Sequence, residues 1–359
     1  MHIPDGYLSP ATCIATYAMT VPFWYVAFAR VKRLLHTRMV PLLAVFSAFA
    51  FVLMMFNLPL PGGTTGHAVG VGIGSVVLGP WGSMVTISIA LLIQAVFFGA
   101  GGVTTFAANC LNMAVAGSLV SYWTYRLISG KSALGSRRRV FAAAIAGYLA
   151  INVAALMTAI ELGVQPLWFV DKAGVPLYAP YPLAIAIPAM MIGHLALAGL
   201  AELLVSAGVV GYLQRANPEL LSFADSCATP KLKSGSLWKS TRMLWYALAG
   251  LMIASPLGLL AAGTAWGEWS VEDFASAEGR QEILQATGSA ALPETVPPGL
   301  ERLADLWTAP IPDYAPGFMH SANLGYILSA VLGSGLILLL FLLLSKLPGK
   351  HGLPESPTN

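Results

Sequence analysis

Charged residues are scarce in this sequence. Only 10% of the 359 residues are Asp, Glu, Lys or Arg, whereas 57% are hydrophobic; an ordinary soluble domain carries about 25% charged residues. Inside a bilayer the backbone must satisfy its own hydrogen bonds, which leaves helices or a closed barrel. Long apolar runs without strand-like alternation favour helices. The composition therefore predicts an all-α polytopic membrane protein.

Several kinds of chemistry are also missing. The three cysteines, Cys13, Cys110 and Cys227, have no CxxC spacing, which excludes a disulfide framework and a thiolate metal site. Residues 130–132 (Gly-Lys-Ser) look like the end of a nucleotide-binding P-loop, but the pattern needs glycine where Tyr125 stands. No HExxH motif or Ser/His/Asp constellation is present. We therefore expect that this chain has no ATPase site and is not an enzyme.

The apolar runs predict nine spans, with the third and fourth short, glycine-rich and tilted or partly re-entrant. They are about 11–29, 41–58, 67–81, 84–98, 103–125, 140–162, 183–213, 243–264 and 324–345. No basic residue precedes the first run, which excludes a cleaved signal peptide and places the N-terminus outside. In this topology 16 of the 19 Lys and Arg residues face the cytoplasm, as the positive-inside rule requires.

Two hydrophilic regions divide the chain. A basic, Ser-rich loop at 213–242 separates a seven-helix unit from a two-helix unit. The segment at about 265–320 is acidic and lies outside in this topology. We expect a small ordered extracytoplasmic region there. Its charge could concentrate cations near the outer face or be ordinary solvated surface.

The N-terminus carries three nitrogen donors within two residues: the Met1 amine, the His2 amide and the His2 imidazole. The bulky His2 should keep Met1 in place. The amine and amide close a five-membered chelate ring, and the amide and Nδ1 close a six-membered ring. Planar nitrogen coordination suits Ni²⁺ or Cu²⁺, and imidazole also suits Co²⁺. The alternative is that His2 is simply an exposed second residue.

His67 is the candidate for the fourth position. It follows a Pro-Gly-Gly turn at 61–63 and starts the third span, on the same outer face as the N-terminus. A lone histidine at a helix start is more often a cap or interface residue. Beside the terminal chelate, we favour His67 as a metal ligand.

Five further polar residues lie within the predicted spans. His194 and Glu202, eight residues apart, share a helix face and are either second-shell, cation or coupling groups or satisfied interhelical contacts. Gln94, Asn109 and Asn112 surround a glycine break at 99–102. Buried amides usually join helices, but these could also orient His2 or His67 through the free ring nitrogen.

These motifs resemble the CbiM/NikM family of substrate-specific membrane components of energy-coupling-factor transporters for cobalt and nickel. The resemblance covers the N-terminal Met-His-Ile-Pro-Asp-Gly-Tyr-Leu-Ser-Pro, the Gly-Gly-Thr-Thr-Gly-His turn, the 94–113 block, and the seventh span through Asn-Pro-Glu-Leu-Leu at 217–221. The region at 243–346 resembles, more loosely, a fused CbiN/NikN-type partner. This implies a metal-binding domain at 1–221, a linker at 222–242, a two-helix domain at 243–346 and a cytoplasmic tail at 347–359.

The resemblance implies that Met1, His2 and His67 hold transported Ni²⁺ or Co²⁺, with no permanent cofactor. It also implies a CbiQ/NikQ-type coupling protein and cytoplasmic ABC ATPases as partners in the cytoplasmic membrane, without nucleic acid. Two alternatives stay open: a membrane metal sensor that does not transport, and an intramembrane metalloenzyme using His67, His194 and Glu202.

Overall fold

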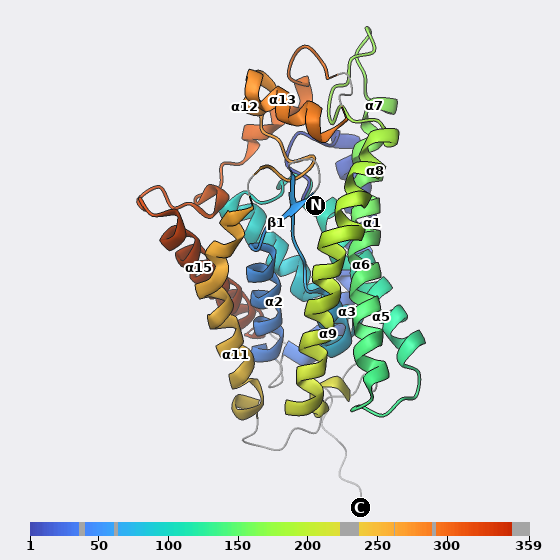
Figure 1. Cartoon of the computed structure of the whole chain (residues 1–359), viewed down its shortest axis with the longest axis vertical. Coiled ribbons are helices and arrows are strands. Elements are labelled where there is room, and N and C mark those ends of the chain that lie inside the picture. Colours follow the sequence, from blue (N-terminus) through green and yellow to red (C-terminus); the bar gives the residue numbers. More distant parts are fainter. Residues whose placement is uncertain (36–39, 61–63, 223–236, 262, 289–291, 347–359) are drawn as a thin grey trace, which may run out of the picture.

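The computed structural model describes residues 1–35, 40–60, 64–222, 237–261, 263–288 and 292–346. These described residues are mostly helical, as predicted, and include one two-stranded sheet (Figure 1). Its elements are α1 (Pro10–Leu35), α2 (Val40–Met54), β1 (Leu58–Leu60), β2 (Thr64–Gly66), α3 (Val71–Ile93), η1 (Gln94–Phe98), α4 (Phe106–Asn109), η2 (Cys110–Ala116), α5 (Gly117–Ser129), α6 (Arg137–Gly163), α7 (Gln165–Trp168), α8 (Leu183–Gly193), η3 (His194–Ala198), α9 (Gly199–Ala216), η4 (Pro218–Ser222), α11 (Leu237–Ala254), η5 (Ser255–Leu260), α12 (Val271–Ala275), α13 (Ala277–Ala286), α14 (Pro298–Leu303), η6 (Ala304–Leu306), η7 (Pro312–Tyr314) and α15 (Ala322–Ser345).

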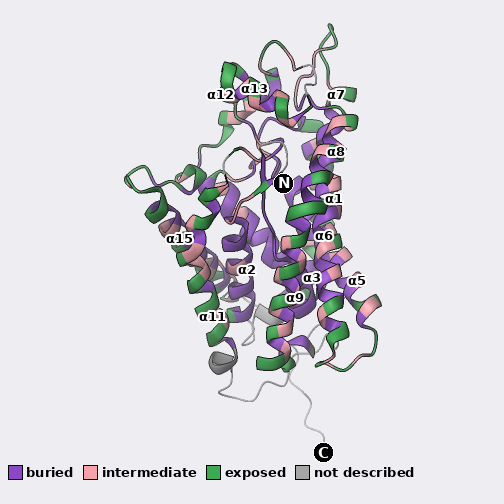
Figure 2. Ribbon diagram, in the orientation of Figure 1, coloured by how far each residue is buried: buried purple, intermediate pink, exposed green. Residues whose placement is uncertain are grey.

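Six helical stretches of the described chain are long and apolar enough to cross a membrane. They are Pro10–Lys32, Val71–Phe98, Arg137–Trp168, Leu183–Ala216, Thr241–Leu260 and Ala322–Ser345. Helix α2 is apolar but shorter. Exposed faces of the outer helices are apolar, with Tyr25, Leu204 and Ile253 among the large exposed side chains, while α3 is buried at the centre (Figure 2). This distribution is that of a bundle surrounded by lipid. The nine membrane crossings expected from the sequence remain a prediction.

Helix α3 folds back on itself at Gly79. This glycine has a φ of +71°, and Pro80 follows it. The Ser75 hydroxyl donates to the Ser83 hydroxyl over 3.2 Å, although residues eight apart in a straight helix are separated by about 12 Å along the axis. The two halves therefore lie against each other, which agrees with the two short segments predicted at 67–81 and 84–98.

The segment before α3 enters the bundle in an extended conformation. Strands β1 and β2 pair antiparallel, with Leu58 opposite Gly66; the predicted Pro-Gly-Gly turn at 61–63 lies outside the described residues. From β2 the chain runs down the middle of the molecule to α3, close to the N-terminus (Figure 1). His67 lies between β2 and α3 and is buried, only 5% exposed.

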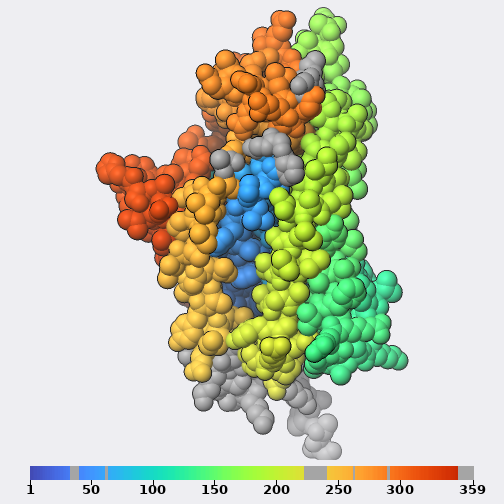
Figure 3. All heavy atoms as spheres, in the orientation of Figure 1, coloured from blue at the N-terminus to red at the C-terminus, as the bar shows by residue number. Residues whose placement is uncertain are grey.

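The C-terminal region packs against the first part of the chain at two levels. Helices α11 and α15 lie beside α2, and helices α12 and α13 lie at the end of the molecule that also carries α7 (Figure 1). In Figure 3, α2 is visible between α9 and α11. An apolar groove of about 430 Å³ runs there, lined by residues of all three helices. Most of the predicted linker and the predicted tail lie outside the described residues.

Candidate metal centre

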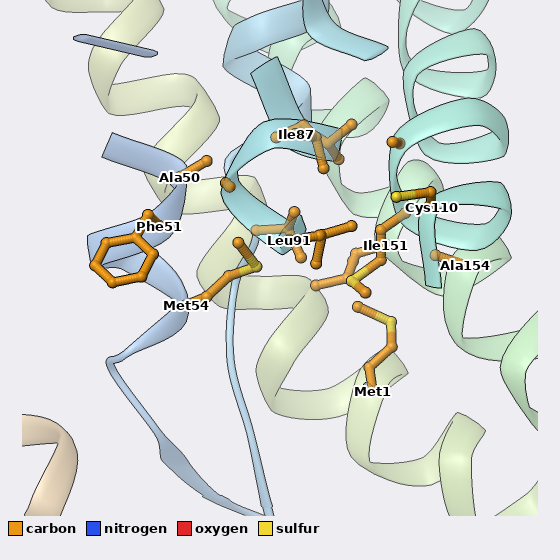
Figure 4. Packing of buried hydrophobic residues seen from close by; sticks show 14 of the residues in the cluster. Met1, Ala50, Phe51, Met54, Ile87, Leu91, Cys110, Ile151 and Ala154 are labelled. Atoms are coloured by element: carbon orange, nitrogen blue, oxygen red, sulfur yellow. The ribbon is translucent and has the colours of Figure 1, made fainter. Parts of the chain in front are cut away.

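The N-terminus is part of the core. Met1 is only 3% exposed, and its side chain lies among buried apolar side chains that include Ile151 and Cys110 (Figure 4). The backbone of Ile3 is fixed on both sides: its N–H donates to Asn109 Oδ1 over 2.8 Å, and its carbonyl accepts from Asn109 Nδ2 over 3.1 Å. The same carbonyl accepts from Gly102 N and the Thr105 hydroxyl. The first residues are thus fixed by hydrogen bonds rather than frayed.

Asp5 makes the second attachment. Its carboxylate accepts hydrogen bonds from the Val103 and Thr104 amides over 2.9 and 2.7 Å, and from the Thr104 hydroxyl. A Cβ atom at Gly102 would lie 2.4 Å from the backbone nitrogen of Asp5, so glycine is required for this approach. The Asp5 contact and the Ile3 contacts both lead to the 101–109 stretch, which fixes the backbone directly after His2.

The two predicted imidazole ligands face each other. His2 Nδ1 and His67 Nε2 are 3.3 Å apart, and both residues are 5% exposed. His67 Nδ1 lies 3.1 Å from the Ala68 carbonyl and donates to it, which leaves Nε2 as the nitrogen with a free lone pair. Burial, followed by the nearby terminal amine, lowers the pKa of His2 to about 3. Burial also lowers the pKa of His67, so both rings are neutral and available as ligands.

The terminal amine and the His2 amide point to one carboxylate. Met1 N forms an ion pair with Glu268 Oε1 over 2.8 Å, and His2 N donates to the same oxygen over 3.0 Å. The structure thus brings together Met1, His2 and His67, the three residues singled out in the sequence, and adds Glu268. Within the described residues no group of three His, Cys, Asp or Glu side chains could hold a metal ion. A metal site here depends on the backbone donors.

Gln94 lies beside the His2 ring. Its side chain raises the pKa of His2 against the larger effect of burial, and its Nε2 donates to the Tyr314 hydroxyl over 2.9 Å. Gln94 Oε1 and His2 Nε2 are both buried and have no hydrogen-bond partner among the described residues. The orienting role of Gln94 stays a prediction.

The two asparagines differ in what they contact. Asn109 holds the backbone of Ile3 rather than a ring nitrogen. Asn112 Nδ2 donates to Thr158 Oγ1 over 3.1 Å and to Glu161 over 2.7 Å. Of the two alternatives for Asn112, these contacts favour the interhelical one, because its amide joins η2 to α6.

His194 and Glu202 are both buried, as predicted, but they have different roles. The Glu202 carboxylate accepts from the amides of Val69, Gly70 and Gly72 over 2.8, 2.8 and 3.1 Å, so it caps α3 directly after His67. His194 Nδ1 donates to the Met190 carbonyl over 2.8 Å, and its Nε2 has no partner among the described residues. The π-turn η3 between the two residues changes the regular helical spacing.

Sequence reasoning did not single out Glu268, Tyr314, Thr105 or Glu161. Glu268 and Tyr314 belong to the C-terminal region. Each contacts a residue of the site that lies more than 200 positions earlier in the sequence. Glu161 was missed although it lies in the predicted span at 140–162 and is, like Glu202, a carboxylate within the predicted spans. The Trp-Gly-Glu-Trp sequence at 266–269 was the available signal for Glu268, because a carboxylate between tryptophans is unusual for solvated surface.

Comparison with known proteins identifies relatives of both parts of the chain. Residues 2–220 match the family described as "Cobalt uptake substrate-specific transmembrane region", and residues 240–349 match the PDGLE domain. The chain is 56% identical over 337 residues to the fused nickel transport protein NikMN of Rhodobacter capsulatus, covering 94% of this chain and 95% of that protein. It is 40% identical to the probable fused nickel transport protein LarMN of Lactiplantibacillus plantarum, with 96% and 97% covered. A crystal structure of a truncated transition metal transporter is 49% identical, with a TM-score of 0.56, over 60% of this chain and 99% of that chain.

Proposed function

The chain belongs to the family of cobalt-uptake substrate-specific transmembrane proteins, and from this premise we propose that it binds the transported ion through Met1, His2 and His67. It is a substrate-specific component for uptake of cobalt or nickel and not an enzyme. One observation carries the proposed site: the buried His2 and His67 rings face each other 3.3 Å apart beside the terminal amine.

Four nitrogens form the proposed donor set: the Met1 amine, the His2 amide, His2 Nδ1 and His67 Nε2. The two chelate rings keep the first three in one plane, and His67 approaches from the fixed start of α3. Nickel is the favoured ion, because planar coordination with a deprotonated amide suits Ni²⁺. The two fused relatives are also named as nickel transport proteins, the second as a probable one.

Transport requires other subunits, since the sequence has no nucleotide-binding motif. We infer that these are a CbiQ/NikQ-type membrane coupling protein and a pair of cytoplasmic ABC ATPases. The end of the molecule opposite α12 and α13 carries Arg137 and Arg215, which line a shared groove between α6 and α9. These basic residues support a cytoplasmic position for this end and an extracytoplasmic position for the N-terminus and the segment at about 265–320, with the protein in the cytoplasmic membrane.

The test is metal binding by purified protein with its native N-terminus, titrated separately with Ni²⁺ and Co²⁺. The comparison is a variant with one extra N-terminal residue, which moves the amine out of the chelate. We expect tight binding of Ni²⁺ by the native protein and loss of binding by the extended protein and by His67→Ala. Equal binding by native and extended proteins would show that the terminus is not the site.

A further inference from the structure

The apolar groove between α2, α9 and α11, with a volume of about 430 Å³, lies apart from the proposed metal site. Helix α11 packs on α2, and Figure 3 shows α2 as the floor of the gap between α9 and α11. We propose that this groove holds an acyl chain of an anionic phospholipid, whose headgroup binds Arg215 and Arg242 at the end of the groove. This inference goes beyond the proposed function, because it concerns a second ligand of a different chemical class.

The walls of the groove are apolar. Val45 and Phe46 of α2 form a buried floor, whereas Tyr212 of α9 and Tyr246 of α11 are 40% and 63% exposed on the two sides. The two tyrosine hydroxyls are the only polar side-chain groups among the lining residues. The volume is in the range of sites that hold small molecules, about 300–1,000 Å³. Since the surrounding solvent is hydrocarbon, an acyl chain is the ligand that such walls accommodate.

Gly208 keeps the α9 side of the groove open. A Cβ atom at this position would meet no atom within 4 Å, so packing within the protein does not require a glycine there. The inward face of the same helix is different: Cβ atoms at Gly72 of α3 or Gly147 of α6 would collide with Ser206 of α9. Helix α9 is therefore tightly packed towards the bundle and leaves free space only towards the groove.

Each wall of the groove supplies one arginine. Arg215 follows Tyr212 by three residues on α9, and Arg242 precedes Tyr246 by four residues on α11, so each arginine lies one helical turn beyond a tyrosine of the groove. These two helix ends lie at the same end of the bundle (Figure 1). Both arginines are exposed, and neither forms an ion pair with a described residue. Two unpaired guanidinium groups beside an apolar groove are complementary to a phosphate headgroup.

This combination favours a lipid over a helix of another membrane protein. An apolar helix seated in the groove would leave both guanidinium groups without an anion, whereas an anionic phospholipid supplies the acyl chain and the charge together. The lipid contacts α2 and α9, from the region that matches the cobalt-uptake family, and α11, from the region that matches the PDGLE domain. It therefore stabilises the association of the two regions.

The experiment uses the full-length protein, purified in detergent and depleted of lipid, and counts bound lipid by native mass spectrometry. The protein is titrated separately with phosphatidylglycerol and with phosphatidylcholine that carry the same acyl chains. We expect phosphatidylglycerol to bind more tightly. Arg215→Gln and Arg242→Gln should each weaken phosphatidylglycerol binding about fivefold, the effect of one arginine near an anionic headgroup, and should leave phosphatidylcholine binding unchanged. Arg302→Gln, which changes an exposed arginine of α14 outside the groove, should equal wild type.

A second pair of variants tests the acyl chain. Gly208→Leu fills the groove and should weaken the binding of both lipids. Gly335→Leu, at a position on α15 that is equally open, should bind both lipids as wild type does. A cooperative melting transition, recorded without lipid, checks that Gly208→Leu is folded, and the arginine variants test the proposal independently of this substitution.

The outcomes that would overturn the proposal are specific. Equal affinity for the two lipids, or wild-type phosphatidylglycerol binding by both arginine variants, would exclude the headgroup site. Wild-type lipid binding by folded Gly208→Leu would place the acyl chain elsewhere, and no bound lipid on the wild-type protein would leave a partner helix as the occupant. The titrations contain no metal, so a failure to bind Ni²⁺ would overturn the proposed function and leave this inference standing.

Discussion

Asn109 tests whether the N-terminal segment must be held in place for the metal site to exist. In the structure its side chain receives a hydrogen bond from Ile3 N over 2.8 Å and donates one to the Ile3 carbonyl over 3.1 Å. Asn109→Ala removes both. The carbonyl keeps Gly102 N and the Thr105 hydroxyl, but the buried N–H of Ile3 loses its acceptor.

The expected effect follows from that N–H. A buried donor left without a partner costs about 1–3 kcal/mol. If the cost is relieved by displacement of residues 1–3, the binding-competent fraction falls, and the apparent dissociation constant rises by the same factor. We therefore expect Ni²⁺ binding about tenfold weaker, within a range of about 5- to 150-fold.

Asn112→Ala is the matched control. It is the same residue type three positions later, also buried, and its hydrogen bonds go to Thr158 and Glu161. We expect it to lower thermal stability without weakening Ni²⁺ binding more than about twofold, because none of its contacts reaches the N-terminus. Titration of both variants, with melting temperatures measured without metal, checks this. Equal loss of affinity in the two would refute the reasoning that Asn109 acts through Ile3.

Three further predictions concern the support of the site. Gly102→Ala should abolish tight Ni²⁺ binding, because the new methyl group would meet the backbone of Asp5, while Gly208→Ala, which has open space, should bind normally in the same titration. Glu202→Ala should lower the unfolding free energy by about 2–5 kcal/mol, because three buried amides of the α3 start lose their acceptor; a melting temperature equal to wild type would contradict this. The metal-free protein should lose stability as pH falls from about 6.5 towards 3: the folded-state pKa of His2 is lowered to about 3, so only the unfolded chain takes up its proton in that window. Melting curves between pH 7.5 and 4.5 check the sign, and His2→Ala should show a smaller decline.

The central part of the site could be predicted because its chemistry is local. The amine, amide and imidazole of residues 1–2 are joined by covalent bonds, so their chelate geometry follows from the sequence alone. The fold-back of α3 is also local, since Gly79 and Pro80 break the helix where they stand. The prediction for His67 needed one more assumption, that His67 and the N-terminus approach from the same face of the membrane. The 3.3 Å distance between the His2 and His67 rings agrees with this assumption.

The contacts that support the site could not be assigned in this way. Asn109 and Asn112 lie three residues apart on neighbouring turns, and the π-turn η2 that begins between them alters the helical spacing. A regular helix therefore gives the wrong expectation for which amide faces the N-terminus. Glu268 is one of several acidic residues in a hydrophilic region, and nothing in its local pattern specifies a partner 267 positions away.

The proposed site depends on backbone donors, which explains why several distant segments contact the first three residues of the chain. A side-chain metal site can be oriented by rotamers alone, but an amine and an amide are oriented only if the chain itself is fixed. Here the fixing elements come from the 101–109 stretch, from the start of α3 and from the turn at 265–269. The last of these belongs to the C-terminal region, so a change in the position of that region would act directly on two of the four donors. Attachment of this region to the same chain keeps Glu268 beside the terminal amine and the His2 amide, where its carboxylate holds the metal-free terminus.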